Sequence, residues 1–383
     1  MKPPIYLDYN GTTPHDPEVI EAMRPFFETE FGNPSSSHWY GIAPKQAVER
    51  ARGQVAGLLG CSPGEVVFTS GGTESNNQAV KSFGGAKAAE GSHIVTTRIE
   101  HPAILEPCRF METHGFSVTY LPVDETGRVS VSDVEDALRA DTVLITVMHA
   151  NNEVGTVQPV AEIAEVAKRK GILFHTDAAQ SLGKIPVDVD SLGVELLSMA
   201  GHKLYAPKGV GALYVRGGMS PKVFCHGAGQ ERGLRAGTEN VLEIVGLGKA
   251  CEVAARDLAA NGEHLAAMRD RLEAGLRSAL GDLRFNGHPE QRLPNTCSVS
   301  FRGLEAGRIL EEIGLEVAAS AGAACHADRV EISHVLEAMR IPEEWAKGTL
   351  RFTTGKMTTA AEIDGALEVV VSAVNKLRRA PRG

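Results

Sequence analysis

Short β-rich runs alternate with helical patterns between residues 65 and 215, and this alternation limits the folds open to the chain. The runs are Val66–Phe68, His93–Thr96, Val118–Leu121, Val143–Val147, Ile172–His175 and Ala212–Val215. Between two of them, residues 160–167 carry apolar side chains at helical spacing, followed by a basic turn and Gly171. Strands that alternate with helices predict an α/β fold with a mainly parallel, doubly wound sheet.

The C-terminal third has a different pattern. A long helical stretch runs from Leu242 to about Leu280, and a new strand, Ser298–Phe301, precedes further helices. We therefore expect a second, smaller α+β domain.

Composition excludes several classes of function. Acidic residues outnumber basic ones 48 to 39 among 383 residues, which makes nucleic acid an unfavourable main partner. The N-terminus lacks the apolar core of a signal peptide, and no stretch approaches the roughly 18 apolar residues of a membrane span. The six cysteines contain no C-x-x-C pair, so neither a zinc site nor a disulfide framework is predicted. We expect a cytoplasmic protein without a membrane partner and without a metal centre.

A phosphate site is predicted at residues 68–77, where an apolar strand passes through Gly71 and Gly72 into a helix. The free N–H groups and the positive end of such a helix attract an anion, and Thr73 adds a hydroxyl donor. The alternative is that these residues only cap the helix. The usual dinucleotide and P-loop motifs are absent from the sequence.

Two further segments place chemical groups after neighbouring strands. The apolar strand at residues 172–176 ends in Asp177, and Gln180 follows three residues later. A carboxylate there suits a protonated pyridine nitrogen and the amide a phenolic oxygen, although an Asp after a strand is often only a helix cap. Lys203 lies 26 residues after Asp177, beyond the next strand, where an amine suits a Schiff base with an aldehyde cofactor. A lone lysine is more often a solvated surface charge.

These motifs together resemble the cysteine desulfurases and the related selenocysteine lyases, which are pyridoxal 5'-phosphate (PLP) enzymes of fold type I. The resemblance covers nearly the whole chain. The matching segments are residues 7–14, 32–36, 70–77, 100–101, 151–155, 177–180, 201–203, 233–238, 323–325 and 350–351. It implies a large PLP-binding domain over residues 15–256 and a small domain over residues 1–14 and 257–383 that carries a reactive cysteine.

The resemblance also implies a role for individual residues around the cofactor. Lys203 would form the Schiff base, and Asp177 would contact the pyridine nitrogen. Gln180 and Asn152 would lie near the phenolic oxygen, and His101 would stack on the ring and shuttle a proton.

The resemblance implies a further set of residues that bind the phosphate of PLP and the substrate. Gly72, Thr73, His202 and, from the neighbouring subunit, Thr238 would hold the phosphate, which implies a homodimer. Arg351 would pair bidentately with the substrate carboxylate, helped by Asn10 and Asn33. Two residues depart from the family pattern: Ala200 replaces a phosphate-binding Ser, which puts one hydrogen bond in question, and Gly11 replaces the usual Ala.

Cys325 is the candidate nucleophile. It lies in a run of small residues, 318–328, which leaves a thiol room to move, and His326 beside it favours the thiolate. Without the resemblance, the favoured interpretation of Cys325 is a small buried apolar residue. Cys61, Cys251 and Cys297 lie in or beside apolar runs and are predicted to be core residues.

The implied function is a PLP-dependent cysteine desulfurase. It would convert L-cysteine to L-alanine, leave the sulfur on Cys325 as a persulfide and pass it to a sulfur-acceptor protein. Two other reactions stay open on the same fold. A selenocysteine lyase would turn selenocysteine into alanine and selenide, and a class-V aminotransferase would need no thiol. A scaffold without enzymatic activity is a third, less favoured interpretation, because it gives Lys203, Asp177 and Arg351 no common role.

Overall fold

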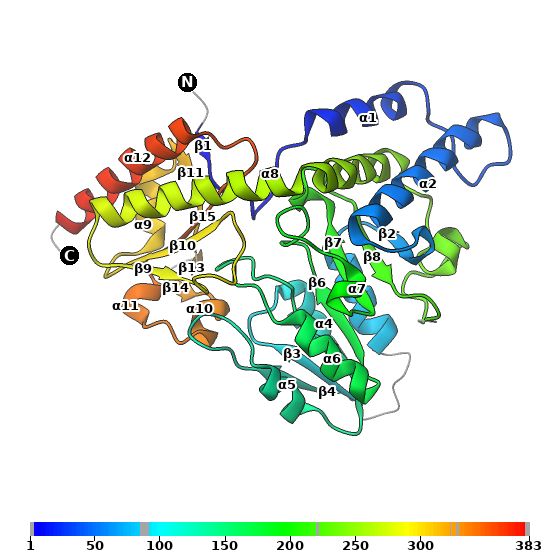
Figure 1. Ribbon diagram of the computed structural model, residues 1–383, viewed down its shortest axis with the longest axis horizontal. Helices are drawn as coiled ribbons and strands as arrows, with labels where there is room; N and C mark the ends of the chain where they lie inside the picture. The colour runs from blue at the N-terminus through cyan, green and yellow to red at the C-terminus, as the bar shows by residue number, and fades with distance from the viewer. Residues whose placement is uncertain (1–3, 85–91, 220–221, 322, 327–328, 380–383) are drawn as a thin grey trace.

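The computed structural model describes residues 4–84, 92–219, 222–321, 323–326 and 329–379. Its largest sheet has seven strands in the order β2-β8-β7-β6-β5-β3-β4 (Figure 1). They are β2 (Val66–Thr69), β3 (His93–Thr97), β4 (Ser117–Leu121), β5 (Thr142–Thr146), β6 (Leu173–Asp177), β7 (Leu196–Ala200) and β8 (Gly211–Val215). Strands β3 to β7 pair in parallel, whereas β8 runs antiparallel to both its neighbours. The predicted α/β fold with a mainly parallel sheet is confirmed, and each predicted run overlaps one strand.

Both faces of this sheet are covered, because successive side chains of a strand point to opposite sides. On one face, Val67 and Leu213 pack with Ile104 of a helix. On the other face, Phe68 and Tyr214 belong to the main core cluster. The helices of this part are α1 (Pro17–Glu28), α2 (Trp39–Leu59), α3 (Gly72–Gln78), α4 (Pro102–Glu112), α5 (Val131–Ala137), α6 (Val160–Lys170) and α7 (Val189–Leu192).

Short turns of helix complete this part. They are the 3-10 helices η1 (Pro63–Glu65), η3 (Gly201–Lys203) and η4 (Gln230–Gly233) and the π-helical η2 (Ala79–Gly84). Helix α6 has the bounds predicted from the sequence, and it ends where Gly171 adopts a left-handed backbone with φ of 66°.

A second, smaller core lies around a four-stranded antiparallel sheet in the order β12-β15-β10-β9. Its strands are β9 (Leu283–Asn286), β10 (Thr296–Phe301), β12 (Ser320–Ala321) and β15 (Thr349–Thr353), covered by α9 (Ala306–Ile313) and α12 (Ala360–Arg379). The N-terminal strand β1 (Ile5–Tyr6) pairs with β11 (Val317–Ala318), and Leu7 is buried in this second core. The short helices α10 (His334–Ala338) and α11 (Glu343–Ala346) lie beside it (Figure 1).

Helix α8 (Val241–Ala279) joins the two cores, with Leu247 in the first and Leu272 in the second. Figure 1 shows it running across both parts. The predicted boundary between residues 256 and 257 therefore falls inside one continuous helix.

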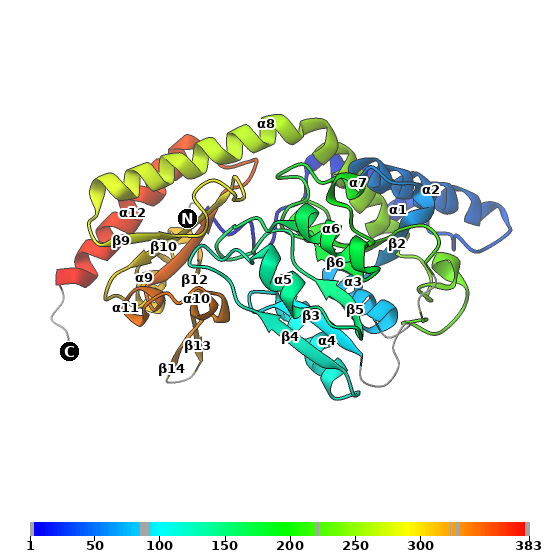
Figure 2. The same cartoon turned by 60° about the horizontal axis from the view of Figure 1, so that its bottom comes forward.

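The segment with the candidate cysteine forms a hairpin of β13 (Ala323–His326) and β14 (Arg329–Ile332). In Figure 2 the hairpin extends away from the four-stranded sheet. Within the described ranges, every helix is too short or too polar to cross a lipid bilayer.

Candidate active site

A pocket of about 380 Å³ lies at the carboxyl ends of β6 and β7, where catalytic groups of open α/β sheets gather. The structure brings ten of the predicted site residues into its lining: Asn10, Gly72, Thr73, His101, Asn152, Asp177, Gln180, His202, Lys203 and Arg351. Asn76 and Ala200 also line it. Residues from both ends of the chain and from the sheet therefore meet at one place.

Three predicted site residues do not join this pocket. Asn33 is exposed, and its side chain accepts a hydrogen bond from the N–H of Ser35 at 2.8 Å. Thr238 is exposed in the segment before α8. Cys325 lies on β13, but its side chain falls outside the described part of the structure.

Lys203 ends the turn η3 that follows β7 directly. Its Nζ donates to the backbone carbonyl of Gly11 at 2.6 Å and to that of Asn10 at 2.5 Å. Burial, helped by the charge of Arg351, lowers the pKa of Lys203 to about 8, against the opposing effect of Asp8 and Asp177. A half-buried amine with a lowered pKa can react as a nucleophile near neutral pH.

Asp177 is the last residue of β6 and is buried at one wall of the pocket. Its carboxylate accepts from the Nδ2 of Asn76 at 2.7 Å and from the N–H of Ala179 at 2.9 Å. The Oδ1 of Asn76 is buried without a hydrogen-bond partner in the described structure. Sequence reasoning missed Asn76, since it is one of two adjacent asparagines on α3 and only the fold shows which one faces Asp177.

The predicted anion site lies where α3 begins. Gly71 has φ of 148°, a conformation that favours glycine, and a Cβ at Gly72 would lie 3.2 Å from the Cβ of Ala200. Gly72, Thr73, His202 and Lys208 line a further hollow of about 370 Å³ that adjoins the pocket through shared residues. Backbone N–H groups, a hydroxyl and a cation thus converge where a phosphate is expected.

The pKa values of His202 and His101 are both lower than that of a free imidazole. Burial, with the nearby charge of Lys203, lowers the pKa of His202 to about 4, so the ring is neutral at pH 7. Burial also lowers the pKa of His101, whose Nδ1 accepts from the N–H of Ala103 at 3.1 Å at the start of α4. Since Nδ1 is an acceptor, a neutral His101 carries its proton on Nε2.

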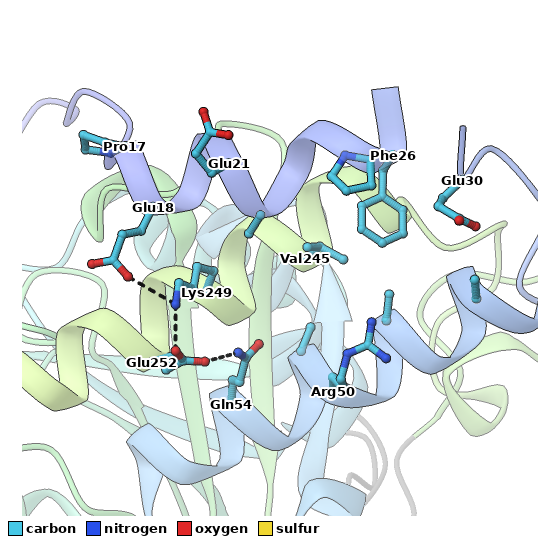
Figure 3. A pocket seen from close by; sticks show the side chains of 15 residues that line it. Pro17, Glu18, Glu21, Phe26, Glu30, Arg50, Gln54, Val245, Lys249 and Glu252 are labelled. Carbon is cyan, nitrogen blue, oxygen red and sulfur yellow. Dashed lines mark hydrogen bonds and ion pairs between the residues drawn. The ribbon is translucent and has the colours of Figure 1, made fainter. Parts of the chain in front are cut away.

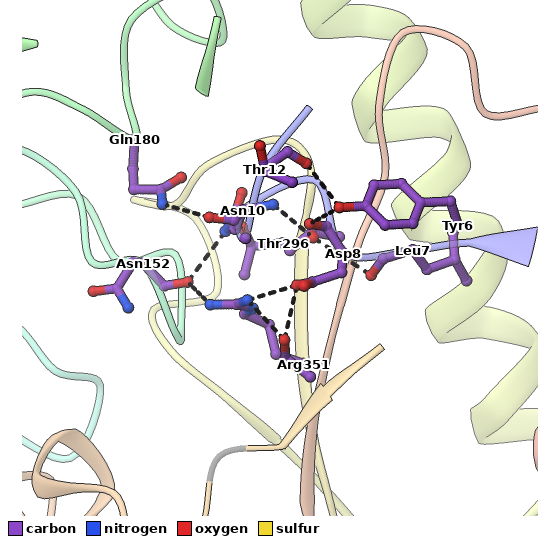
Figure 4. A network of polar contacts seen from close by, with 12 residues as sticks. Tyr6, Leu7, Asp8, Asn10, Thr12, Asn152, Gln180, Thr296 and Arg351 are labelled. Atoms are coloured by element: carbon purple, nitrogen blue, oxygen red, sulfur yellow. Dashed lines mark hydrogen bonds and ion pairs between the residues drawn. The ribbon is translucent and has the colours of Figure 1, made fainter. Parts of the chain in front are cut away.

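Arg351 of β15 is held by three oxygen acceptors (Figure 4). Nη2 donates to Oδ1 of Asp8 at 2.6 Å and to the hydroxyl of Ser320 at 3.1 Å, and Nη1 donates to the carbonyl of Asn152 at 3.0 Å. Its Nε is buried and has no hydrogen-bond partner in the described structure. The edge formed by Nε and Nη2 is one that a carboxylate binds with two oxygens.

The glycine at position 11, where the family usually has Ala, leaves room for the Asp8 carboxylate. A Cβ at Gly11 would lie 2.3 Å from Asp8 Oδ2.

A buried lysine beneath the pocket was not predicted from the sequence. Lys184 donates to the backbone carbonyl and to Oε1 of Gln180 at 2.9 and 3.0 Å, and to Oδ1 of Asn10 at 3.3 Å. Asn10 is 1% exposed, and its Nδ2 donates to Thr296 and to the carbonyl of Asn152. The only sequence signal for Lys184 is its position one helical turn after Gln180.

Outside this pocket, a larger hollow of about 800 Å³ opens between α1, α2 and α8 (Figure 3). It contains none of the predicted site residues, and four of its polar side chains contact one another: Lys249 lies 3.2 Å from Glu18 and 2.7 Å from Glu252, which also accepts from Gln54. Among the described residues, no group of three or more His, Cys, Asp or Glu side chains is placed to hold a metal ion.

The cysteines other than Cys325 are not paired in disulfides. Cys251 and Cys297 are buried as predicted, whereas Cys61 is only half-buried beside the main core. Burial raises the pKa of Cys61 to about 12 and also raises the pKa of Cys251 and that of Cys297. None of these three thiols is activated as a nucleophile.

Comparison with known proteins finds relatives of this chain by sequence and by fold. A family model described as Aminotransferase class-V matches residues 5–365. A cysteine desulfurase IscS of Dictyoglomus turgidum is 48% identical over 379 residues, covering 99% of this chain and 96% of the relative. A cysteine desulfurase IscS of Methanosarcina thermophila is 47% identical over 375 residues, covering 98% and 93%.

Two solved structures resemble the whole fold. One, described as a NifS-like protein, has a TM-score of 0.92 and 38% sequence identity, and the match covers 97% of this chain and 100% of that chain. The other is SspA in complex with cysteine, with a TM-score of 0.80 and 37% identity, over 92% of this chain and 99% of that chain.

Proposed function

Because the chain belongs to the class-V aminotransferase family, we propose that it is a PLP-dependent cysteine desulfurase. It converts L-cysteine to L-alanine and takes the sulfur onto Cys325 as a persulfide. The family resemblance drawn from the motifs is confirmed by these matches. The observation that carries the proposal is that Lys203, with its lowered pKa, shares one pocket with Asp177 and Arg351.

The residues of the pocket fit PLP. Asp177 is an acceptor that suits a protonated ring nitrogen, and it is itself held by Asn76, whose buried Oδ1 has no partner in the described structure. Gly72 and Ala200 face each other so closely that any side chain at 72 would narrow the anion site. When bound, PLP supplies an aldehyde that condenses with amines and a ring that accepts electrons from the substrate.

The set of residues that would hold the cofactor follows from this fit. Lys203 would bind the cofactor covalently, and Asp177 would contact its ring nitrogen. Gln180 and Asn152 would contact the phenolic oxygen, and His101 would lie over the ring. The phosphate would be held by Gly72, Thr73 and His202 of this chain and by Thr238 of the partner subunit. Thr238 and Asn33 are both exposed in this chain. The exposure of Thr238 supports a homodimer in which it completes the neighbour's site, whereas Asn33 stays a proposed substrate-binding residue outside the pocket lining.

The substrate is oriented by the protein's own side chains. The Nε and Nη2 edge of Arg351 binds the carboxylate of L-cysteine in place of Asp8, and Asn10 lines the same pocket. Lys203 would take the proton from the substrate Cα, because its lowered pKa leaves a large neutral fraction near pH 8. His101, with its Nε2 proton, donates and recovers protons at the substrate sulfur.

The transfer of sulfur to Cys325 needs no external oxidant, because the substrate carbon accepts the electrons that the sulfur loses. The Cys325 thiolate attacks the substrate sulfur, so the bond from that sulfur to Cβ breaks and a sulfur–sulfur bond forms. Sulfur is oxidised to the persulfide level, and Cβ is reduced to the methyl group of alanine. The hairpin of β13 and β14 extends away from its neighbouring sheet, which supports delivery of the persulfide to a sulfur-acceptor protein (Figure 2).

The proposal is tested by incubating the PLP-loaded protein with L-cysteine and measuring alanine, sulfide and protein-bound persulfide. We expect alanine and one persulfide on Cys325, and Cys325→Ala to abolish both, while Cys61→Ala as the matched control changes neither. Alanine formed from selenocysteine by Cys325→Ala, with cysteine turnover lost, would identify a selenocysteine lyase. Pyridoxamine phosphate and a keto acid, independent of Cys325, would identify an aminotransferase.

A further inference from the structure

Lys184 lies in the turn after β6 and is only 8% exposed. All three hydrogen-bond partners of its Nζ are oxygens: the backbone carbonyl of Gln180, Oε1 of Gln180 and Oδ1 of Asn10. A lysine ammonium has three donors and no acceptor. The geometry therefore matches the charged form, one donor to each oxygen.

The orientation of the Gln180 amide is fixed from two sides. Its Nε2 donates to the backbone carbonyl of Asn10 at 3.1 Å, and a carbonyl can only accept. Its Oε1 faces Lys184 at 3.0 Å, which donates. If the amide turned over, nitrogen would face the ammonium and oxygen would face a carbonyl, and both hydrogen bonds would be lost.

The side-chain amide of Asn10 is held in one orientation in the same way. Both amides that accept from Lys184 are therefore fixed. Its Nδ2 donates to the carbonyl of Asn152 at 3.2 Å, which leaves Oδ1 to accept from Lys184 and from Nδ2 of Asn295 at 2.9 Å. The backbone carbonyl of Asn10 also accepts from Lys203. Lys184 thus bonds to Gln180 directly and to Asn10, whose backbone carbonyl accepts from both Gln180 and Lys203.

We propose that Lys184 is a positioning residue that holds the Gln180 amide with its nitrogen, not its oxygen, available to the pocket. One N–H of Nε2 is taken by Asn10, and the second remains for a ligand oxygen. The proposal rests on the proposed function, in which that oxygen is the phenolic oxygen of PLP. Lys184 itself does not line the pocket of about 380 Å³ that Gln180 lines.

Burial makes the charged form of Lys184 costly, and its three oxygen acceptors reduce that cost. Burial and the charges of Lys203 and Arg351 lower the pKa of Lys184 to about 7. The three oxygen acceptors stabilise the ammonium against this effect. Replacing Lys184 with an apolar side chain removes the donor to Oε1 and leaves only the Asn10 carbonyl to hold the amide. The amide then turns over more often, and the turned amide presents an acceptor to a negatively charged oxygen.

The test measures the pKa of the visible absorption change in the PLP-loaded protein. A donor to the phenolic oxygen makes it a weaker base and lowers this pKa, so Lys184→Met is expected to raise it by roughly one pH unit. Gln180→Met is expected to raise it as well. If Lys184 acts through Gln180, at least half of the Lys184→Met shift disappears in the Gln180→Met background. Lys168→Met, an exposed lysine on α6, is the matched control and leaves the pKa unchanged.

No shift in Lys184→Met, or a shift more than half retained in the double variant, overturns the proposal. A wild-type protein without a visible band overturns the proposed function itself, before any variant is measured. Should Lys184→Met fail to fold, neutron diffraction of the wild-type holoenzyme decides. Three deuterons on Lys184 and the Gln180 nitrogen toward Asn10 are expected, whereas a neutral Lys184 or the reverse amide overturns the proposal.

Discussion

The Nη2 of Arg351 lies 2.6 Å from the carboxylate of Asp8, so residues 343 positions apart in the chain form an ion pair at the pocket. The pair is largely buried, with side-chain exposures of 12% for Arg351 and 25% for Asp8. Asp8 thus occupies one of the donors that a substrate carboxylate needs. The two carboxylates compete for the same guanidinium edge.

Asp8→Asn is predicted to lower KM for L-cysteine about five- to tenfold with kcat little changed, because it removes the negative charge that competes for Arg351. Steady-state kinetics of alanine formation checks this. A KM that rises instead would mean that Asp8 chiefly holds Arg351 in position. Asp270→Asn, an exposed acidic residue remote from the pocket lining, is the control.

Arg351→Lys is predicted to reduce kcat/KM for L-cysteine by at least about 100-fold, because an ammonium cannot present two parallel donors to a carboxylate. The loss should appear mainly in KM. Binding of PLP should be unchanged, since Arg351 is not among the residues proposed to hold the cofactor. Equal losses for cysteine and for cysteamine, which has no carboxylate, would contradict the assigned role.

Ala200→Ser is predicted to slow dissociation of PLP about tenfold. The Cβ of Ala200 lies beside Gly72 at the anion site, where a hydroxyl would add a hydrogen bond to a charged oxygen. Dissociation is followed by loss of the visible band after dilution into an excess of a PLP scavenger. Faster loss than in the wild type would show that the site has no room for the hydroxyl.

The reaction of the unloaded protein with PLP is predicted to follow the lowered pKa of Lys203. Below about pH 8 the amine is mostly protonated, so the rate of condensation should rise about tenfold per pH unit and then level off. An unperturbed lysine would keep gaining rate up to its ordinary pKa near 10.4. Stopped-flow absorbance from pH 6 to 10 distinguishes the two profiles, and a rate still rising at pH 10 would contradict the account.

Local patterns were enough to predict the sheet and the residues at its edge. The apolar run at residues 172–175 predicted β6, and Lys203 was expected beyond the next strand along the chain. That strand, β7, pairs in parallel with β6, so their carboxyl ends meet at one edge and bring Asp177 and Lys203 together. The family resemblance added Arg351 and His101, which lie far apart in the sequence.

The residues that support the site were not predictable in this way. Asn76, Asp8 and Lys184 act through contacts between distant segments, and each looks unremarkable in its own neighbourhood. The expected boundary at residues 256 and 257 came from the family resemblance. It lies inside the long helix expected from residue 242, because α8 packs on the first core at Leu247 and on the second core at Leu272.

The central claim is that the amine of Lys203 carries the cofactor. Reduction of the PLP-loaded protein with borohydride, followed by proteolysis and mass spectrometry, locates the attached pyridoxyl group directly. The account predicts one modified lysine, Lys203, and no modification in Lys203→Ala. A pyridoxyl group found on Lys184 or on a surface lysine, with Lys203 unmodified, would contradict it.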